Sequence, residues 1–222
     1  MDSIKNELWL QKAIAFNVRA RAEMWGKNNT EIMAFVYEYG LANKTVEKLL
    51  LGWNRRDKSR PVENWGLESF DNDEKLRLPA GIVVPYVVDE NLKKVTIVRH
   101  MHETVNKNHV IAGSLSVSMV FGKPAALVLV VDNILDGLLL VQECHFNQKR
   151  EDICIILPHD LSASADGHAK EFLDKAAKVI FCCENGKESY SVWAEELNNP
   201  VYLDYQNQAE LVIKTGGLEA PS

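Results

Sequence analysis

Three carboxylates stand in two short turns of this chain, and each turn follows an apolar run. Asp132 and Asp136 lie in the segment DNILD after residues 125–131, and Glu184 opens the segment ENG after residues 179–183. Open α/β sheets place their ligand sites at the carboxyl ends of their strands. Carboxylates at such an edge can bind a hard cation or exchange a proton. The sequence therefore predicts that these three side chains meet at one edge of a sheet.

The elements that would position these carboxylates alternate along the C-terminal part of the chain. Four apolar runs predict strands, and each is followed by a segment with helical spacing, as is typical of a parallel sheet. The strands are expected at 125–131, 153–157, 179–183 and 201–203, with helices at 135–143, 167–178, 188–197 and 209–215. This pattern predicts a compact α/β domain over residues 123–222.

The N-terminal part reads as helical and then β-rich. Helices are expected at 4–25, 30–39 and after Asn43, which makes residues 1–52 a helical region with Gly40 as a C-cap. A helix-turn-helix DNA reader is the alternative to a bundle closing on its own core, but the third helix offers few polar side chains for base edges. Residues 53–80 are rich in Asn, Asp, Gly and Pro and predict a linker. Residues 81–122 predict a β-rich subdomain that begins with a hairpin turning at 89–91.

Charge is unevenly distributed between the two halves. Residues 1–110 carry 17 Lys and Arg against 15 Asp and Glu, whereas residues 111–222 carry 8 against 16. The positive charge is densest at Arg55, Arg56, Lys58 and Arg60, and these residues with Arg99 are the candidate phosphate contacts. The alternative for the same run is a solvated loop.

Other functional classes find less support. The N-terminus has no apolar signal segment and no run is long enough to span a bilayer, so a cytoplasmic protein without a membrane partner is expected. Cys144, Cys154, Cys182 and Cys183 show no C-x-x-C spacing, so no zinc is expected, and three of them lie in or beside apolar runs, which predicts buried free thiols. A histidine cluster, His100, His102 and His109 around Glu103, could hold a metal but reads more simply as polar loop residues.

Several short segments, which follow one another in the same order as in the family, resemble primase-type Toprim proteins, particularly the phage and plasmid forms related to bacterial DNA primase. The family landmarks RGL, TI, LG and GIVIP are similar to YGL at 39–41, TV at 45–46, LG at 51–52 and GIVVP at 81–85, and the resemblance continues through Trp25, Arg99 and residues 113–114. It implies a Rossmann-like Toprim sheet flanked by helices, preceded by the helical region and the hairpin.

The same resemblance implies roles for the three carboxylates. In the first family motif, EGxxD, Asp132 stands at the glutamate, Asn133 at the glycine and Asp136 at the aspartate. In the second, DxDxAG, Glu184 stands at the first aspartate, Gly186 at the second and Ser189 at the final glycine. Asp132, Asp136 and Glu184 are thus the implied catalytic residues, with Asp136 and Glu184 as ligands of Mg²⁺. Because one carboxylate is missing and two differ in length, the implied Mg²⁺ site is weak. Glu188 could replace the missing ligand, although a glutamate there also suits a helix N-terminus.

Three functions remain open on this evidence. The first is a catalytically degenerate primase-like protein that binds single-stranded DNA or a replication protein, such as a helicase or primase, in replication or mobile-element biology. The second is an active Mg²⁺-dependent primase or nuclease that uses the altered triad. The third is a protein-binding module, which the acidic C-terminal half favours because it repels phosphate.

Overall fold

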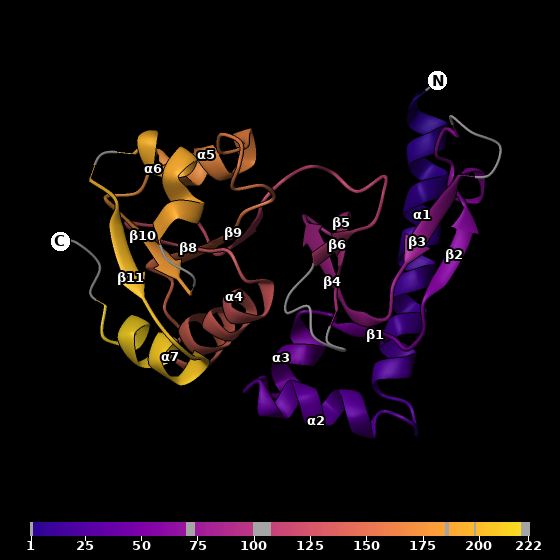
Figure 1. Ribbon diagram of the computed structural model, residues 1–222, viewed down its shortest axis with the longest axis horizontal. Helices are drawn as coiled ribbons and strands as arrows, with labels where there is room; N and C mark the ends of the chain where they lie inside the picture. The colour runs from indigo at the N-terminus through magenta and orange to yellow at the C-terminus, as the bar shows by residue number, and fades with distance from the viewer. Residues whose placement is uncertain (1, 70–73, 100–107, 185–186, 198, 219–222) are drawn as a thin grey trace. The chain divides into compact units, whose positions relative to one another are not determined.

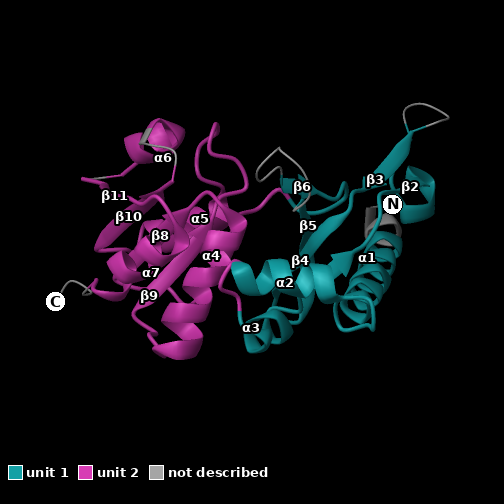
Figure 2. Cartoon of the chain, turned by 60° about the horizontal axis from the view of Figure 1, so that its bottom comes forward, with its two compact units in different colours: residues 1–38, 42–115 teal, residues 39–41, 116–222 magenta. Residues whose placement is uncertain are grey.

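The computed structural model describes residues 2–69, 74–99, 108–184, 187–197 and 199–218. The chain forms two compact units, residues 1–38 with 42–115 and residues 39–41 with 116–222 (Figure 2). Among the described helices, none combines the length and apolarity needed to cross a membrane. The elements of the first unit are α1 (Asp2–Met24), α2 (Thr30–Glu38), α3 (Asn43–Lys48), β1 (Gly52–Asn54), β2 (Lys58–Pro61), the 3-10 helix η1 (Val62–Trp65), β3 (Lys75–Leu78), β4 (Gly81–Val88), β5 (Asn91–Val98) and β6 (Asn108–Val110).

An antiparallel sheet with the strand order β1-β4-β5-β6 forms the centre of the first unit, and β2 and β3 form a separate hairpin. Helix α1 lies along this sheet because Trp9, Ala13, Phe16 and Ala20 recur on one face and are all buried. The approach is close at Gly52, where an added Cβ would lie 2.6 Å from the Cβ of Ala20. A glycine is therefore needed where β1 meets the helix.

The β4–β5 turn confirms the expected hairpin. Asp89 and Glu90 have φ values of 49° and 63°, and positive φ at both central residues is the geometry of a type I′ turn. Gly40, expected as a C-cap, has a φ of 94° after α2.

The second unit contains the expected α/β sheet, with the order β11-β10-β8-β9-β7. β8, β9, β10 and β11 are parallel, and β7 joins the edge antiparallel to β9. In Figure 1, α5 and α6 lie on one face of this sheet and α4 and α7 on the other. Its elements are β7 (Met119–Phe121), β8 (Leu127–Val131), α4 (Ile134–Leu140), the π-helix η2 (Val141–Asn147), β9 (Ile153–Leu157), α5 (Gly167–Leu173), β10 (Lys178–Cys183), the 3-10 helix η3 (Lys187–Tyr190), α6 (Ser191–Glu195), β11 (Val201–Asp204) and α7 (Gln208–Gly216).

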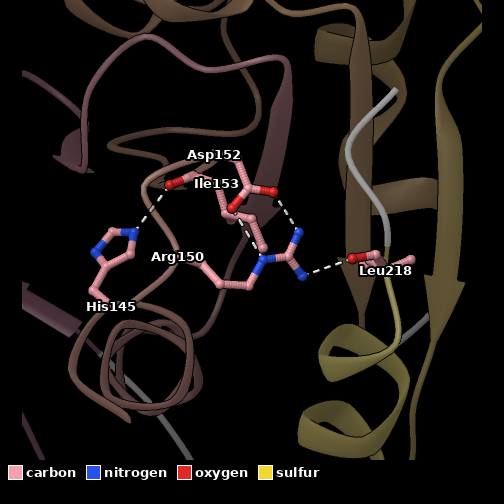
Figure 3. Close-up of polar contacts among 5 residues, drawn as sticks. All are labelled: His145, Arg150, Asp152, Ile153 and Leu218. Atoms are coloured by element: carbon pink, nitrogen blue, oxygen red, sulfur yellow. Dashed lines mark hydrogen bonds and ion pairs between the residues drawn. The ribbon is translucent and has the colours of Figure 1, made fainter. Parts of the chain in front are cut away.

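A cluster of polar contacts lies at the start of β9 in this unit (Figure 3). Arg150 donates from Nε and Nη2 to the two carboxylate oxygens of Asp152 at 3.0 and 2.5 Å, and from Nη1 to the carbonyl of Leu218 at 2.6 Å. His145, in the π-helix, lies 3.0 Å through Nε2 from the carbonyl of Ile153. Because a carbonyl only accepts, Nε2 carries the proton. These contacts tie the start of β9 to η2 and to the chain after α7.

The structure departs from the sequence expectations in three places. Residues 53–80 are not a bare linker, because they form β1, β2, η1 and β3 and bury Trp53 and Trp65 in the first unit. The β-rich subdomain expected over 81–122 is divided, because β7 at its end belongs to the sheet of the second unit. The helix expected at 188–197 is divided between η3 and α6. All four cysteines are free and buried, whereas the sequence predicts burial for three of them.

Candidate functional site: an acidic strand edge and a basic cleft

The three predicted carboxylates lie close together in the second unit. Asp132 follows β8 and Glu184 follows β10, and these parallel strands are neighbours with Val131 opposite Cys182. Asn133 caps α4, and its side-chain oxygen accepts from the backbone N–H groups of Leu135 and Asp136. This cap fixes the first turn of α4, and with it the position of Asp136.

Asp136 is fully buried, and hydrogen-bond donors surround its carboxylate. Tyr39 donates its hydroxyl to Oδ1, Gln208 donates Nε2 to the same oxygen at 3.2 Å, and Tyr205 donates its hydroxyl to Oδ2 at 2.6 Å. Burial, together with the Asp136 carboxylate, raises the pKa of both tyrosines, so both hydroxyls keep their protons and remain donors. The carboxylate thus joins residues 39–41 and α7 to α4. That Asp136 binds a metal ion, as the family resemblance implies, stays a prediction.

Asp132 has different surroundings. Its Oδ1 is buried and has no hydrogen-bond partner within the described part of the chain. Its backbone N–H donates to the hydroxyl of Tyr190 at 2.9 Å, and that hydroxyl donates to the carbonyl of Cys182 at 2.7 Å. Burial raises the pKa of Asp132 above its ordinary value. A cation would therefore find one uncommitted carboxylate oxygen here.

Glu184 completes the acidic edge. It is partly exposed, and Asn133 lies 3.5 Å from its Oε2 through Nδ2, at the limit of a hydrogen bond. Burial and then the charges of Asp136 and Asp132 raise the pKa of this carboxyl group. Like charges held together in this way repel unless a cation neutralises them.

The donor set fits Mg²⁺ only partly. Mg²⁺ takes six oxygens and is commonly held by one or two carboxylates plus water or substrate phosphates. Asp132 and Glu184 could supply two such ligands, whereas the oxygens of Asp136 already accept three hydrogen bonds. No group of three or more His, Cys, Asp or Glu side chains in the described ranges is arranged to hold a metal. Gly186 lies outside those ranges, and Glu188, the suggested substitute ligand, is an exposed residue of η3.

We expect Asp132→Asn to raise the free energy of unfolding at neutral pH. The raised pKa means that the folded state pays to keep this carboxylate charged. That cost is complete above the folded pKa and disappears as pH falls below the unfolded value of about 3.9, so the gain should be clear at about pH 7 and vanish near about pH 3. Urea unfolding at both pH values measures it. An equal gain at both would contradict the electrostatic cause.

The basic residues predicted to contact phosphate lie in the first unit. Lys58 on β2 and Arg99 after β5 line one cleft of about 450 Å³. Arg55, Arg56 and Arg60 are exposed but do not line it, and Arg55 lies 5.8 Å from the centre of the Trp53 ring. This basic cleft is lined by Asp57, Lys58, Ser59, Arg77, Pro79, Arg99, Asn108 and His109.

Two further basic residues of the cleft, Arg77 and His109, were not among the predicted phosphate contacts. Arg77 is an exposed position of β3, where Leu76 and Leu78 are buried, and this alternation in the sequence could have revealed it. His109 lies on β6, which was not expected, and its Nε2 donates to the carbonyl of Arg77 at 3.1 Å. The remaining members of the histidine cluster, His100 and His102 with Glu103, lie outside the described residues.

Comparison with solved structures relates the fold of this chain to that of primase catalytic domains. No family model matches the sequence, and no curated protein matches it. The structure, however, is similar to that of a DnaG primase catalytic domain bound to single-stranded DNA, with a TM-score of 0.68 at 11% identity over 97% of this chain and 77% of that one. It is also similar to a primase domain from Pseudomonas aeruginosa (TM-score 0.66, 11% identity, 93% and 74% covered) and to the E. coli primase catalytic core (0.63, 12%, 94% and 75%). The chain therefore has the primase-like Toprim fold of these catalytic cores.

Proposed function

We propose that this chain is a catalytically degenerate, primase-like Toprim protein that binds single-stranded DNA through the basic cleft. Its setting is DNA replication or the biology of a phage, plasmid or other mobile element. One of the similar solved structures holds single-stranded DNA, which makes this nucleic acid the first ligand to test. A replication protein such as a helicase or primase is the partner to test next.

The proposal that catalysis is lost rests on the acidic edge of the second unit. The Asp136 carboxylate already accepts hydrogen bonds from Tyr39, Tyr205 and Gln208, and glycine stands at position 186. Phosphoryl transfer needs a metal ion seated against both substrate oxygens, and a displacement of about 1 Å can cost on the order of 100-fold in rate. Two carboxylates are a weak basis for that placement.

The proposal that the chain binds single-stranded DNA rests on the basic cleft. Lys58, Arg77 and Arg99 come from three different segments and face one concave surface. The one carboxylate among the described lining residues, Asp57, accepts a hydrogen bond from the backbone of Ala80 at 2.7 Å through Oδ1. Cations gathered in a cleft attract a phosphate backbone and release its counterions.

An active Mg²⁺-dependent enzyme is the second candidate, because Asp132 offers an unpartnered oxygen beside Glu184. Incorporation of labelled ribonucleotides on a single-stranded DNA template, with Mg²⁺ or Mn²⁺, separates the two candidates. We expect the wild type to give no more product than the matched Asp132→Asn/Glu184→Gln variant. Product made by the wild type and lost in that variant would establish the enzyme and refute the degenerate reading.

A further inference from the structure

A second cavity lies within the first unit. It occupies about 580 Å³ where α1 meets β1, η1 and the β2–β3 hairpin, a volume within the range of ~300–1,000 Å³ that small-molecule sites occupy. All of its lining residues belong to the first unit, whereas the acidic edge belongs entirely to the second. Whatever binds here does not need the three carboxylates.

The walls of this cavity are strongly positive. Lys12 and Arg19 extend from α1, Lys58 and Arg60 extend from β2, and Glu23 is the one carboxylate among the residues of the lining that the structure describes. None of these four cations lies within ion-pair distance of a carboxylate among the described residues. Unneutralised cations that converge from two elements are suited to a compact, multiply charged anion.

The same cavity has an aromatic wall. Phe16, Trp53 and Trp65 contribute to the lining, and the rings of Phe16 and Trp65 pack edge to face with centroids 6.2 Å apart. The Nε1 of Trp53 is buried and finds no acceptor among the described residues. A buried donor without a partner is costly.

We propose that this cavity is a binding site for a mononucleotide that is not consumed at the acidic edge. The phosphates would contact Lys12, Arg19 and Arg60, and the base would pack against the aromatic wall. Cations and flat apolar surfaces in one cavity match the two halves of a nucleotide. The ligand would then be held in a unit that carries none of the predicted catalytic carboxylates.

Calorimetric titration of the full chain with ATP tests this site, with tryptophan fluorescence as a second readout. We expect saturable binding that weakens at least about 10-fold in Lys12→Ala/Arg19→Ala, because two charged contacts are lost. Both side chains are exposed on α1, so the fold should survive, and Arg60→Ala repeats the test from the opposite wall. The matched control is Lys27→Ala/Lys75→Ala, which removes two exposed cations of the same unit that do not line the cavity.

Three further titrations decide the nature of the ligand. Inorganic triphosphate and adenosine should each bind at least about 10-fold more weakly than ATP. ATP binding should be unchanged in EDTA and in Asp132→Asn/Glu184→Gln, which keeps this site separate from any catalytic one. Equal binding of triphosphate and ATP, loss of binding in the carboxylate variant, or an effect of the control variant as large as that of the cavity variant would each overturn the proposal.

Discussion

Replacement of Asp136 by alanine should lower the free energy of unfolding by on the order of 3 kcal/mol. The substitution removes the acceptor for the hydroxyls of Tyr39 and Tyr205 and for the amide of Gln208. Each buried donor left without a partner costs about 1–3 kcal/mol, and the space left by the carboxylate adds to the loss. Urea unfolding followed by circular dichroism measures the change.

Two milder variants separate the hydrogen bonds from the cavity. Asp136→Asn keeps the side-chain volume and one acceptor oxygen, so it should lower the free energy of unfolding less than Asp136→Ala does. Tyr205→Phe removes one hydroxyl and leaves the carboxylate with its other two donors, at a cost of about 1.5 kcal/mol. The free energy of unfolding of Asp136→Ala could instead lie within about 0.5 kcal/mol of the wild-type value, which is the range of ordinary surface substitutions. In that case this carboxylate does not stabilise the unit.

Loss of two cations from the basic cleft should weaken binding to single-stranded DNA by about 10-fold at low salt. Arg77→Ala/Arg99→Ala is the variant of choice because these two residues line the cleft but not the second cavity of the same unit. Each lost phosphate contact should also reduce the slope of log K against log salt by about 0.7, or about 1.4 for the pair. Fluorescence anisotropy with a labelled oligonucleotide, titrated at several salt concentrations, gives both quantities.

The control for this prediction again is Lys27→Ala/Lys75→Ala. It lowers the charge of the unit equally but alters exposed residues outside the cleft. Should both variants lose affinity to the same degree, the binding would follow net charge and the cleft would have no special part in it.

The second unit could largely be predicted from the sequence, because strong apolar runs set its strands. Successive residues such as Val128 and Leu129 point to opposite faces of the sheet and are both buried, because helices cover both faces, and this gives continuous apolar runs that are easily recognised. The first unit was harder. β1, β2 and β3 are three or four residues long and lie among loop-forming residues, so no window reveals their periodicity.

The candidate site, too, could be predicted from the sequence only in part. That Asp132, Asp136 and Glu184 share one edge could be predicted because parallel strands end together. That Asp136 is enclosed could not, since Tyr39 and Tyr205 approach it from positions 97 and 69 residues away. Likewise, the pairing of β2 with β3, which brings Arg77 beside Ser59, depends on contacts that no local pattern specifies.

The central claim is that this primase-like fold binds single-stranded DNA through its first unit, without a metal at the acidic edge. Anisotropy titration of a labelled single-stranded oligonucleotide, performed in EDTA and again in millimolar Mg²⁺, tests it most directly. We predict binding in EDTA that weakens steeply with added salt and persists in Asp132→Asn/Glu184→Gln. Binding that appears only with Mg²⁺ and is lost in that variant, or that does not respond to salt, would contradict the account.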